Sequence, residues 1–314
     1  MSRRTNLPSS LGPDFSVGEA IEAGATRNRL DANDLVSPFW GARSRHRTEL
    51  RPLNETVAER FERAHREFVA LCTSYVPIAP DGFRFSHVTA ARLFHIPLPA
   101  RLRSRAGLDV AVPVGRQYPR RVGVIGHRVP GPLGDRVVDG LPVLHPERVW
   151  FQLAPALTID EMVVAGDHLV RRKRAASSIP LLTSALAAAG GFTGVGKART
   201  ALLAVRPGTD SPRESEVRLS IVRAGLPKPV IGYAVRDDGG FFIGTPDLAY
   251  VAEKIAIEYQ GKHHQTDDGT YEDDIIRRQL FVAAGWHVIL VTKAHAVQYT
   301  VGRVREALAQ RGAP

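Results

Sequence analysis

Two hydrophobic patterns alternate along the chain, one with the period of a helix and one made of short apolar runs. Apolar residues at positions 57, 61, 64, 68 and 71 have helical spacing and predict a helix there. Similar patterns predict helices over residues 86–96, 147–156, 160–170 and 211–222. Apolar runs predict strands over residues 110–114, 122–125, 230–235, 241–243, 246–250 and 254–260. This mixture indicates an α+β fold.

The first fifty residues have the pattern of two short helices joined by a glycine turn. Ser16 is placed to cap the first helix, and Thr26 to cap the second, which contains Arg27 and Arg29. Residues 35–41 then supply strand pieces of a wing. The pattern predicts a winged helix-turn-helix whose arginines face phosphates or base edges. A small helical cap with solvated arginines is the alternative.

The middle of the chain offers two strands whose limits are marked by proline and glycine. Pro113 marks the first as an edge strand, because proline has no backbone N–H, and residues 126–128 close the second. His87 and His95 lie eight residues apart on a predicted helix. No third ligand is nearby in the sequence, so we expect these histidines to serve in packing rather than in metal binding.

Residues 191–198 nearly spell a phosphate-binding loop. Ala198 has no hydroxyl where the motif has Ser or Thr, and the preceding residues 181–189 predict an Ala-rich helix rather than a buried strand. We therefore expect a loop between two helices and no bound nucleotide cofactor.

Charge is distributed unevenly along the chain. Residues 209–314 hold 13 Lys and Arg and 14 Asp and Glu, whereas residues 1–208 hold 29 and 18. A turn-rich segment over residues 206–212 marks the change and predicts a domain boundary near residue 209. The formal net charge of +10 thus belongs to the front part, which favours a polyanionic partner such as nucleic acid. The alternative is two domains with different surfaces.

Composition limits the class of protein. With 44% hydrophobic and 24% charged residues, the 314-residue chain can bury substantial cores and is neither collagen-like nor disordered. The single cysteine, Cys72, excludes an intrachain disulfide framework and fits a reducing compartment. The sequence has neither the pattern of a signal peptide nor an apolar stretch of about eighteen residues. We expect a soluble cytoplasmic protein without a membrane partner, in which any metal is held by oxygen or histidine.

Asp247 and Glu258 occupy predicted strand positions where the sequence otherwise has apolar residues. Two carboxylates on neighbouring strands repel each other and lose hydration, a cost that a bound cation offsets. Mg²⁺ (or Mn²⁺) prefers oxygen ligands and retains waters, and the backbone carbonyl of Tyr259 or Gln260 is a further candidate ligand. Hydrolysis of a phosphodiester bond is the hypothesis that follows.

Asp247 and Glu258 also belong to a recognisable motif. Pro246-Asp247, followed after ten residues by Glu258-Tyr259-Gln260, resembles the PD-(D/E)XK nuclease motif, with Gln260 in the usual lysine position. Residues 257–264, 274–277 and 284–288 resemble the very-short-patch-repair-like endonuclease domain common in actinobacterial proteins. The resemblance covers residues 209 to about 310 and implies a restriction-endonuclease-like α/β domain with a mixed central sheet. The implied catalytic residues are Glu214, Asp247, Glu258, Gln260, Lys262 and His264.

The resemblance implies a role for each residue of this set. Asp247 and Glu258 would bind the metal, and Glu214 would help through a water or orient the site. Lys262 is placed to replace the missing lysine, since a cation there offsets charge that develops on the phosphate. His264 is the candidate general base at neutral pH, with a surface turn as its alternative role. Arg277 is a candidate phosphate contact, and helical ion pairs with preceding acids are its alternative role.

The front part resembles a second family. Residues 15–43, 86–93 and 146–167 look like the winged-helix and C-terminal modules of abortive-infection type antitoxins, which commonly precede such endonuclease domains. This resemblance implies DNA binding or transcriptional autoregulation, with a cognate toxin or other protein as a candidate second partner. Arg27, Arg29 and Arg43 are the candidate nucleic-acid contacts of this part. We therefore expect a winged helix-turn-helix over residues 1–47, an α+β middle domain over 48–208 and the endonuclease-like domain over 209–314.

The sequence is consistent with two functions. The first is a metal-dependent DNA endonuclease that its N-terminal modules position on duplex. The second is an antitoxin-like DNA-binding transcriptional regulator whose nuclease fold has lost catalysis and serves as a binding platform. Gln260 in the lysine position keeps the second function open, whereas the presence of Glu214, Asp247 and Glu258 favours the first.

Overall fold

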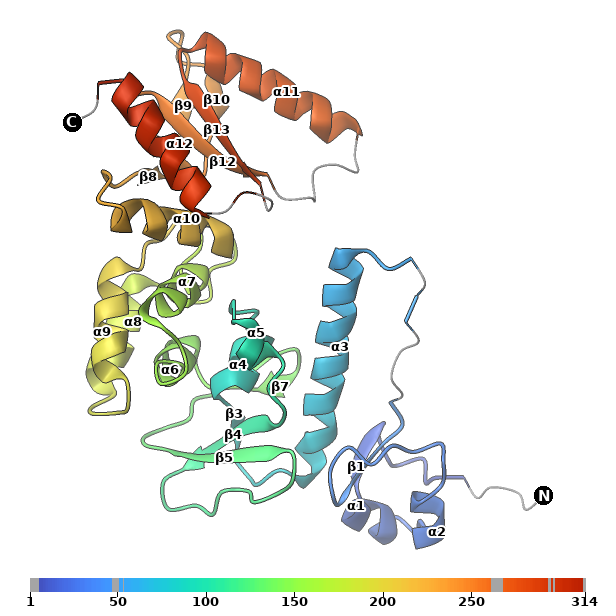
Figure 1. Cartoon of the computed structure of the whole chain (residues 1–314). Coiled ribbons are helices and arrows are strands. Elements are labelled where there is room, and N and C mark those ends of the chain that lie inside the picture. The colour runs from blue at the N-terminus through green and yellow to red at the C-terminus, as the bar shows by residue number, and fades with distance from the viewer. Residues whose placement is uncertain are drawn as a thin grey trace. The chain divides into compact units, whose positions relative to one another are not determined.

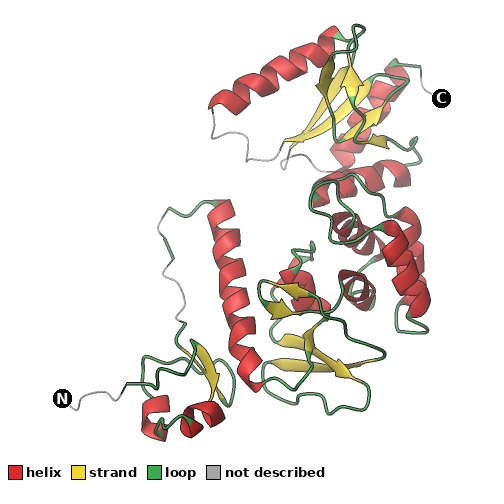
Figure 2. Ribbon diagram, turned by 180° about the vertical axis from the view of Figure 1, so that it is seen from behind, coloured by secondary structure: helices red, strands yellow, loops and turns green. Residues whose placement is uncertain are grey.

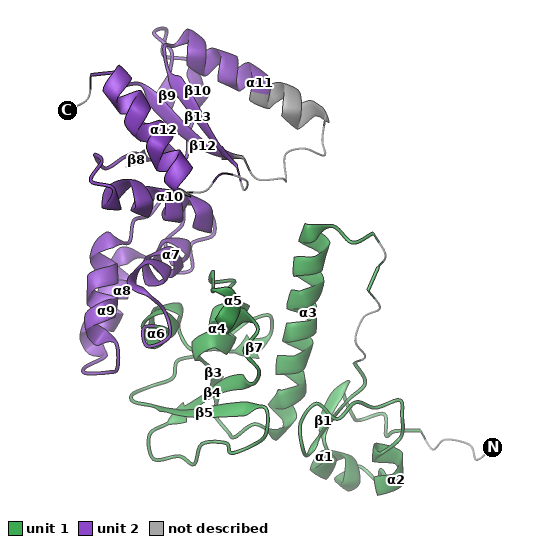
Figure 3. Cartoon of the chain, in the orientation of Figure 1, with its two compact units in different colours: residues 1–153 green, residues 154–314 purple. Residues whose placement is uncertain are grey.

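Helices and strands are mixed throughout the computed structural model, which describes residues 6–46, 51–52, 54–260, 268–292, 295 and 297–312 (Figure 2). They form two units, unit 1 over residues 1–153 and unit 2 over residues 154–314 (Figure 3). The expected α+β class is confirmed. The boundaries expected at 47/48 and 208/209 lie inside these units and stay predictions.

Unit 1 begins with a two-stranded ribbon, and two short helices connect its strands. Strand β1 (Asp14–Ser16) pairs antiparallel with β2 (Ala42–Ser44), and helices α1 (Val17–Glu22) and α2 (Arg27–Leu30) lie between them in the chain (Figure 1). Helix α1 begins where the Ser16 hydroxyl accepts a hydrogen bond from Glu19 N while the Glu19 carboxylate accepts one from Ser16 N, a reciprocal cap. The two expected helices and their caps are confirmed.

The strand expected over residues 35–41 is wrong. Within that stretch only Val36 forms a bridge, to Ser44. Pro38 has no N–H to donate, and Gly41 turns the chain with φ +86°, so the segment reverses direction just before β2 begins. The ribbon is built from the residues that flank the two helices instead.

The rest of unit 1 combines a small sheet with helices. In chain order its elements are α3 (Val57–Tyr75), the 3₁₀ helix η1 (Val76–Ile78), β3 (Arg84–Phe85), α4 (His87–Leu93), α5 (Ala100–Arg103), β4 (Leu108–Pro113), β5 (Val124–Val129), β6 (Val137–Val138), β7 (Leu141–Pro142) and α6 (Pro146–Gln152). The sheet order is β3-β4-β5, with β3 antiparallel and β5 parallel to β4. The buried face of α4 contains Val88, Ala91 and Leu93.

Two expectations about this sheet are wrong. Strand β4 is the central strand, not an edge, and Pro113 is its last paired residue. Strand β5 does not end at residues 126–128 but runs on to Val129. Gly126 is needed inside the strand because a Cβ there would lie 2.5 Å from Tyr118 Cδ2, so the Tyr118 ring packs directly on the strand backbone.

Unit 2 starts with three helices, α7 (Ile159–Leu169), α8 (Ile179–Ala188) and α9 (Val195–Ala204). It continues with α10 (Pro212–Arg223), β8 (Val230–Ile231), β9 (Val235–Arg236), β10 (Phe242–Gly244), β11 (Leu248–Tyr250), β12 (Ile255–Gln260), α11 (Asp268–Ala283), β13 (His287–Thr292) and α12 (Val297–Gln310). The main sheet has the order β13-β12-β11-β8, in which β12 and β13 are parallel and the other pairs antiparallel. It is therefore a mixed sheet.

The two faces of this sheet are covered by different elements. One face packs against α10 and α12 in a cluster that contains Ile221, Ile257 and Val304. The other face packs against α11 and the β9–β10 hairpin in a cluster that contains Ala256 and Phe281. Alternation along β12 assigns Glu258 to the same face as Ala256, which is the α11 face.

A buried ion pair connects the helices α7 and α10. Asp167 Oδ2 lies 2.7 Å from Arg218 Nη2, and the two side chains are 0% and 7% exposed. Arg206 N donates to the other carboxylate oxygen of Asp167 at 2.7 Å. Asp167, which belongs to residues 154–208, is therefore the charged partner of a residue in α10, the helix that precedes the main sheet in the chain.

The glycine-rich segment over residues 191–198 lies between α8 and α9, as expected, and the preceding element is a helix. Lys197 Nζ donates to the carbonyls of Ala154 at 2.7 Å and Leu157 at 2.5 Å. The lysine that a phosphate loop would use thus stabilises a chain turn. Among the described residues, no helix combines the length and apolarity needed to cross a membrane.

Candidate active site

Glu258 of the predicted carboxylate pair lies on β12, and Asp247 lies one residue before the neighbouring strand β11. Residues 248–250 of β11 pair antiparallel with residues 255–257 of β12. One further step of this register puts Asp247 opposite Glu258. Directly opposed residues of an antiparallel pair project their side chains to one face, with Cβ atoms about 5 Å apart. The sequence prediction that these two acids are brought together is therefore supported by the strand register.

Asp247 is held by the backbone of the neighbouring strand. Its Oδ2 accepts a hydrogen bond of 2.7 Å from Tyr259 N. Burial is the main cause that raises the pKa of Asp247 to about 6; the negative charge of Glu258 adds to it, and the Tyr259 hydrogen bond opposes it. Burial and the charge of Glu258 therefore both favour the protonated form of Asp247.

Helix α10 adds a third carboxylate. Its first turn begins at Ser211, whose hydroxyl accepts from Glu214 N at 3.2 Å, and the Glu214 carboxylate accepts from Asp210 N at 2.9 Å. Glu214 is only 8% exposed. Burial and then the charge of Asp247 raise the pKa of Glu214 to about 7. Asp247 thus interacts through its charge with both Glu258 and Glu214.

Two arginines stand beside this group of acids. Arg277 Nη2 of α11 lies 3.5 Å from Glu258 Oε1, with 38% of the Arg277 side chain exposed. The close approach of α11 depends on Gly244, because a Cβ there would lie 3.2 Å from Arg277 Cδ. Arg172 lowers the pKa of Asp247 through its charge, although its guanidinium is paired with Asp210 at 2.6 Å. These cations compensate the acids only in part, since the pKa of Asp247 stays raised.

The donor set fits a hard divalent cation. Asp247 and Glu258 offer carboxylate oxygens, which Mg²⁺ and Mn²⁺ prefer over nitrogen and sulfur. A cation between them would offset the repulsion that adds to burial in raising the pKa of Asp247. The arrangement therefore supports the expectation of a metal ion held by Asp247 and Glu258.

The remaining predicted catalytic residues cluster just after β12. Gln260 is the last residue of that strand, and its backbone pairs with Thr292 of β13. Lys262 and His264 lie outside the described residues, as does the Gln260 side chain. Their catalytic roles stay predictions.

The three predicted nucleic-acid-binding arginines of unit 1 have different surroundings. Arg27 is exposed on α2. Arg29 forms a two-point ion pair with Asp34, at 2.9 and 2.7 Å, and its side chain is 10% exposed. Arg43 donates to the Leu30 carbonyl at 2.7 Å and pairs with Asp31 at 3.0 Å. Arg29 and Arg43 thus both serve inside the fold, and DNA contact by any of the three stays a prediction.

Sequence reasoning missed a cluster of three titratable residues in unit 1. His87, Asp109 and His127 each offer a ligand atom, and these atoms all lie within 4.8 Å of one another. His87 does not share its surroundings with His95, as its helix spacing suggested; its ring stacks on His127. The overlooked signal is Asp109, a carboxylate inside the apolar run Leu108 to Val112.

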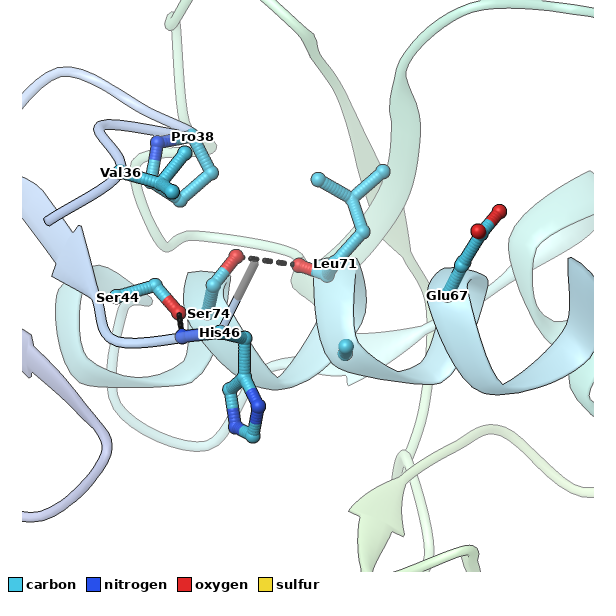
Figure 4. Close-up of a pocket in the computed structure, with 8 residues that line it drawn as sticks. Val36, Pro38, Ser44, His46, Glu67, Leu71 and Ser74 are labelled. Atoms are coloured by element: carbon cyan, nitrogen blue, oxygen red, sulfur yellow. Dashed lines mark hydrogen bonds between the residues drawn. The ribbon is translucent and has the colours of Figure 1, made fainter. Parts of the chain in front are cut away.

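Unit 1 also has a shallow pocket between the segment after α2 and the helix α3 (Figure 4). Its volume is about 180 Å³, and it is lined by Val36, Pro38, Ser44, His46, Glu67, Ala70, Leu71 and Ser74. Ser44 Oγ accepts from His46 N at 3.1 Å, and Ser74 Oγ donates to the Leu71 carbonyl at 2.8 Å. These hydroxyls serve local backbone contacts, so we assign no chemistry to the pocket.

Comparison with known proteins adds little to this geometry. No protein-family model matches the chain, and no curated protein matches it. Among solved structures, the chain is similar to the crystal structure of the RV2827C protein from Mycobacterium tuberculosis, with a TM-score of 0.35 and 18% identity. The similarity covers 71% of this chain and 83% of that chain. A likeness this weak carries no argument about function.

Proposed function

We propose that the chain is a divalent-metal-dependent endonuclease that hydrolyses phosphodiester bonds of DNA, with its active site at Glu214, Asp247 and Glu258. The observation that carries the proposal is the register of β11 and β12, which sets Asp247 opposite Glu258. The PD-(D/E)XK resemblance of the same residues and the mixed sheet that bears them support a restriction-endonuclease-like domain in this part of the chain.

The proposed chemistry divides between a bound cation and the side chains. A divalent cation supplies positive charge to the phosphate and lowers the pKa of a bound water. Asp247 and Glu258 hold the cation, and Tyr259 N keeps the Asp247 carboxylate oriented through its hydrogen bond. Glu214, with a pKa of about 7, can accept a proton from the attacking water near neutral pH. Arg277, next to Glu258 and partly exposed, would contact the phosphate.

Cleavage of supercoiled plasmid by the purified full-length protein tests this proposal. With Mg²⁺ or Mn²⁺ we expect nicking that EDTA prevents and that Asp247→Ala and Glu258→Ala each reduce by at least about a hundredfold. Glu253→Ala is the matched control, because Glu253 lies in the turn at the other end of the same two strands. This variant should cleave like wild type.

Absence of cleavage on plasmid, single-stranded DNA and RNA would overturn the endonuclease proposal. Equal cleavage by wild type and Asp247→Ala would do the same, because it would reveal a contaminating nuclease. In either case the antitoxin-like regulator becomes the better explanation of the carboxylate group, which would then serve as a platform without catalysis.

The DNA-binding part of the proposal rests on exposed arginines of unit 1. Beside Arg27, the exposed residues Arg120 and Arg128 flank the Tyr118 ring, with guanidinium carbons 5.4 and 4.8 Å from its centroid. Arginines combined with an aromatic ring are typical of nucleic-acid-binding surfaces. Unit 1 also holds most of the positive charge, with 22 Lys and Arg against 15 Asp and Glu.

Salt-dependent binding to duplex DNA tests these arginines. Arg120→Ala combined with Arg128→Ala should weaken binding and reduce the slope of log K against log salt by about two, one unit for each lost phosphate contact. Arg27→Ala should lower the slope by about one if α2 also contacts phosphate. An unchanged slope in both variants would remove DNA binding from unit 1.

A further inference from the structure

The His87, Asp109 and His127 cluster is assembled from three elements of unit 1. His87 begins α4, Asp109 lies in the central strand β4, and His127 lies in β5. The parallel register pairs Ala111 with His127, so the histidine is one diagonal step from Asp109 on the same face of the sheet. Residues 40 positions apart in the chain are thus brought together by strand pairing and by the start of a helix.

The donor atoms of the cluster are close enough to share one ion. His127 Nε2 lies 2.8 Å from Asp109 Oδ1. The His87 ring stacks on the His127 ring with centroids 3.7 Å apart and an angle of 19° between their planes. All three ligand atoms lie within 4.8 Å of one another, and no other group of this kind occurs in the part of the chain that the structure describes.

The carboxylate is fixed by contacts on the side away from the histidines. Asp109 Oδ2 accepts hydrogen bonds from Arg105 and from Thr89 N, the latter at 3.4 Å, and Asp109 N donates to Thr89 Oγ1 at 2.7 Å. Metal-ligating carboxylates are usually oriented by such outer hydrogen bonds. Oδ1 is therefore held toward the two imidazoles.

His87 is fixed as firmly. Its Nδ1 lies 3.0 Å from Ser86 Oγ, and its backbone N donates to Gln152 Oε1 at 3.1 Å. The hydrogen bond at Nδ1 leaves Nε2 as the ligand atom of this ring. His87 also has φ +46°, a conformation that is uncommon for residues other than glycine and that persists where surrounding contacts enforce it.

The cluster is open to solvent on one side. Asp109 is 1% exposed, whereas the His127 side chain is 24% exposed. An ion could therefore reach the imidazoles without unfolding the sheet, and three protein ligands leave room for water or an exchangeable ligand.

We propose that His87, Asp109 and His127 form a binding site for a divalent transition-metal ion such as Zn²⁺ or Co²⁺, separate from the carboxylate site of unit 2. Two imidazoles and one carboxylate suit ions of intermediate softness, whereas Mg²⁺ prefers oxygen alone. A bound metal would replace the Asp109–His127 hydrogen bond with bonds to Asp109 Oδ1 and His127 Nε2, and the proton of that hydrogen bond would pass to His127 Nδ1 or to solvent. The site does not depend on the proposed nuclease activity.

Co²⁺ titration of the chelator-treated full-length protein tests the site, because cobalt bound by protein nitrogen and oxygen gives visible absorption bands. The background is Asp247→Ala, so that the carboxylate group of unit 2 contributes no signal. We expect one equivalent of Co²⁺ to bind, with Zn²⁺ displacing it. His127→Gln and His87→Gln should each weaken binding by more than about tenfold.

His95→Gln is the matched control, because His95 also packs against another histidine, His65, at a centroid distance of 4.2 Å, outside the cluster. It should bind Co²⁺ like the background protein. Far-UV circular dichroism shows whether each variant is folded. Of the two cluster variants, we expect His127→Gln to fold better, because the His127 side chain is partly exposed.

Three results would overturn the site: no visible bands at millimolar Co²⁺, bands unchanged in both folded His87→Gln and His127→Gln, or bands lost in His95→Gln alone. Absence of plasmid cleavage by the wild-type protein, together with Co²⁺ binding in the Asp247→Ala background, would contradict the nuclease proposal and leave this site standing. The two proposals therefore fail separately.

Discussion

Asp109 of unit 1 and Asp247 of unit 2 are both aspartates at sheet positions among apolar residues, yet their pKa values move in opposite directions. Burial alone would raise the pKa of Asp109, but hydrogen bonds from His127 and Arg105 outweigh it and hold the pKa below its ordinary value. Burial raises the pKa of Asp247 to about 6, and Glu258 adds repulsion. Burial is common to both, and the neighbours decide the direction.

The difference bears on which ions the two places can attract. Asp247 is close to other acids, so a hard cation bound there would stabilise its charged form. Asp109 already has cationic and imidazole neighbours, so an added ion must compete through coordination to nitrogen rather than through charge alone. We therefore expect magnesium-like ions in unit 2 and transition metals in unit 1, as proposed above.

The largest effect on stability should come from neutralising Asp109, whose carboxylate is hydrogen-bonded to His127 and Arg105. Asp109→Asn removes the negative charge that Arg105 and His127 share, and it should lower the free energy of unfolding by about 3 kcal/mol. Urea denaturation at pH 7 measures the change. Asp135→Asn is the control, because the Asp135 side chain is fully exposed and should have no effect. A change below about 0.5 kcal/mol in Asp109→Asn would contradict the comparison.

A smaller effect of opposite sign is expected at Asp247. Because its pKa is raised in the folded protein, the folded state binds a proton more tightly than the unfolded chain, and the free energy of unfolding falls as pH rises from about 4 to about 6. Asp247→Asn removes this cost and should stabilise the metal-free protein by about 2 kcal/mol at pH 8.

Denaturation at pH 4 and pH 8 in EDTA checks this prediction. The gain from Asp247→Asn should be small at pH 4, where the wild-type carboxyl is already protonated. Glu253→Gln, at the far end of the same strands, should behave alike at both pH values. A gain at pH 4 equal to that at pH 8 would mean that the amide stabilises by packing and not by removal of charge.

The smallest effect is the response to magnesium. At ten times its dissociation constant, Mg²⁺ should raise the free energy of unfolding at pH 8 by about 1.4 kcal/mol. The shift should disappear in Asp247→Asn and on addition of EDTA, and Asp109→Asn should retain it. Thermal melting in paired buffers measures the shift; an equal response in Asp247→Asn would place magnesium elsewhere.

Local signals in the sequence predicted the helices and the carboxylate pair of unit 2. Ser16, Thr26 and Ser211 cap helices where the sequence placed them, because a cap depends on residues within one turn. The pairing of β11 with β12 was equally predictable from the sequence, since two adjacent strands joined by a short turn have few possible registers.

Long-range pairing could not be predicted in the same way. Strands β4 and β5 are parallel although only residues 114–123 separate them, a connection shorter than parallel strands usually need. Gly126 looked like a strand end, whereas the ring of Tyr118, eight residues earlier, requires it. His127, whose ring stacks on that of His87, lies 40 residues further along the chain, whereas helix spacing indicated His95 as the neighbour.

Asp109, by contrast, was predictable. The reasoning that singled out Asp247, a carboxylate where a strand otherwise has apolar residues, applies equally to Asp109. Applied there, it would have identified a buried charge in need of partners, with His127 on the neighbouring strand as a candidate.

The buried pair of Asp167 and Arg218 determines where the chain can be cut. A fragment that began at residue 209 would keep the sheet, α10 and all three acids, but it would lack Asp167, the carboxylate that pairs with Arg218, and the helix α7 on which α10 packs. A fragment that began at residue 154 would keep both charges. The helices α7 to α9 are thus part of the smallest piece in which Glu214, three residues into α10, can be expected to hold its place.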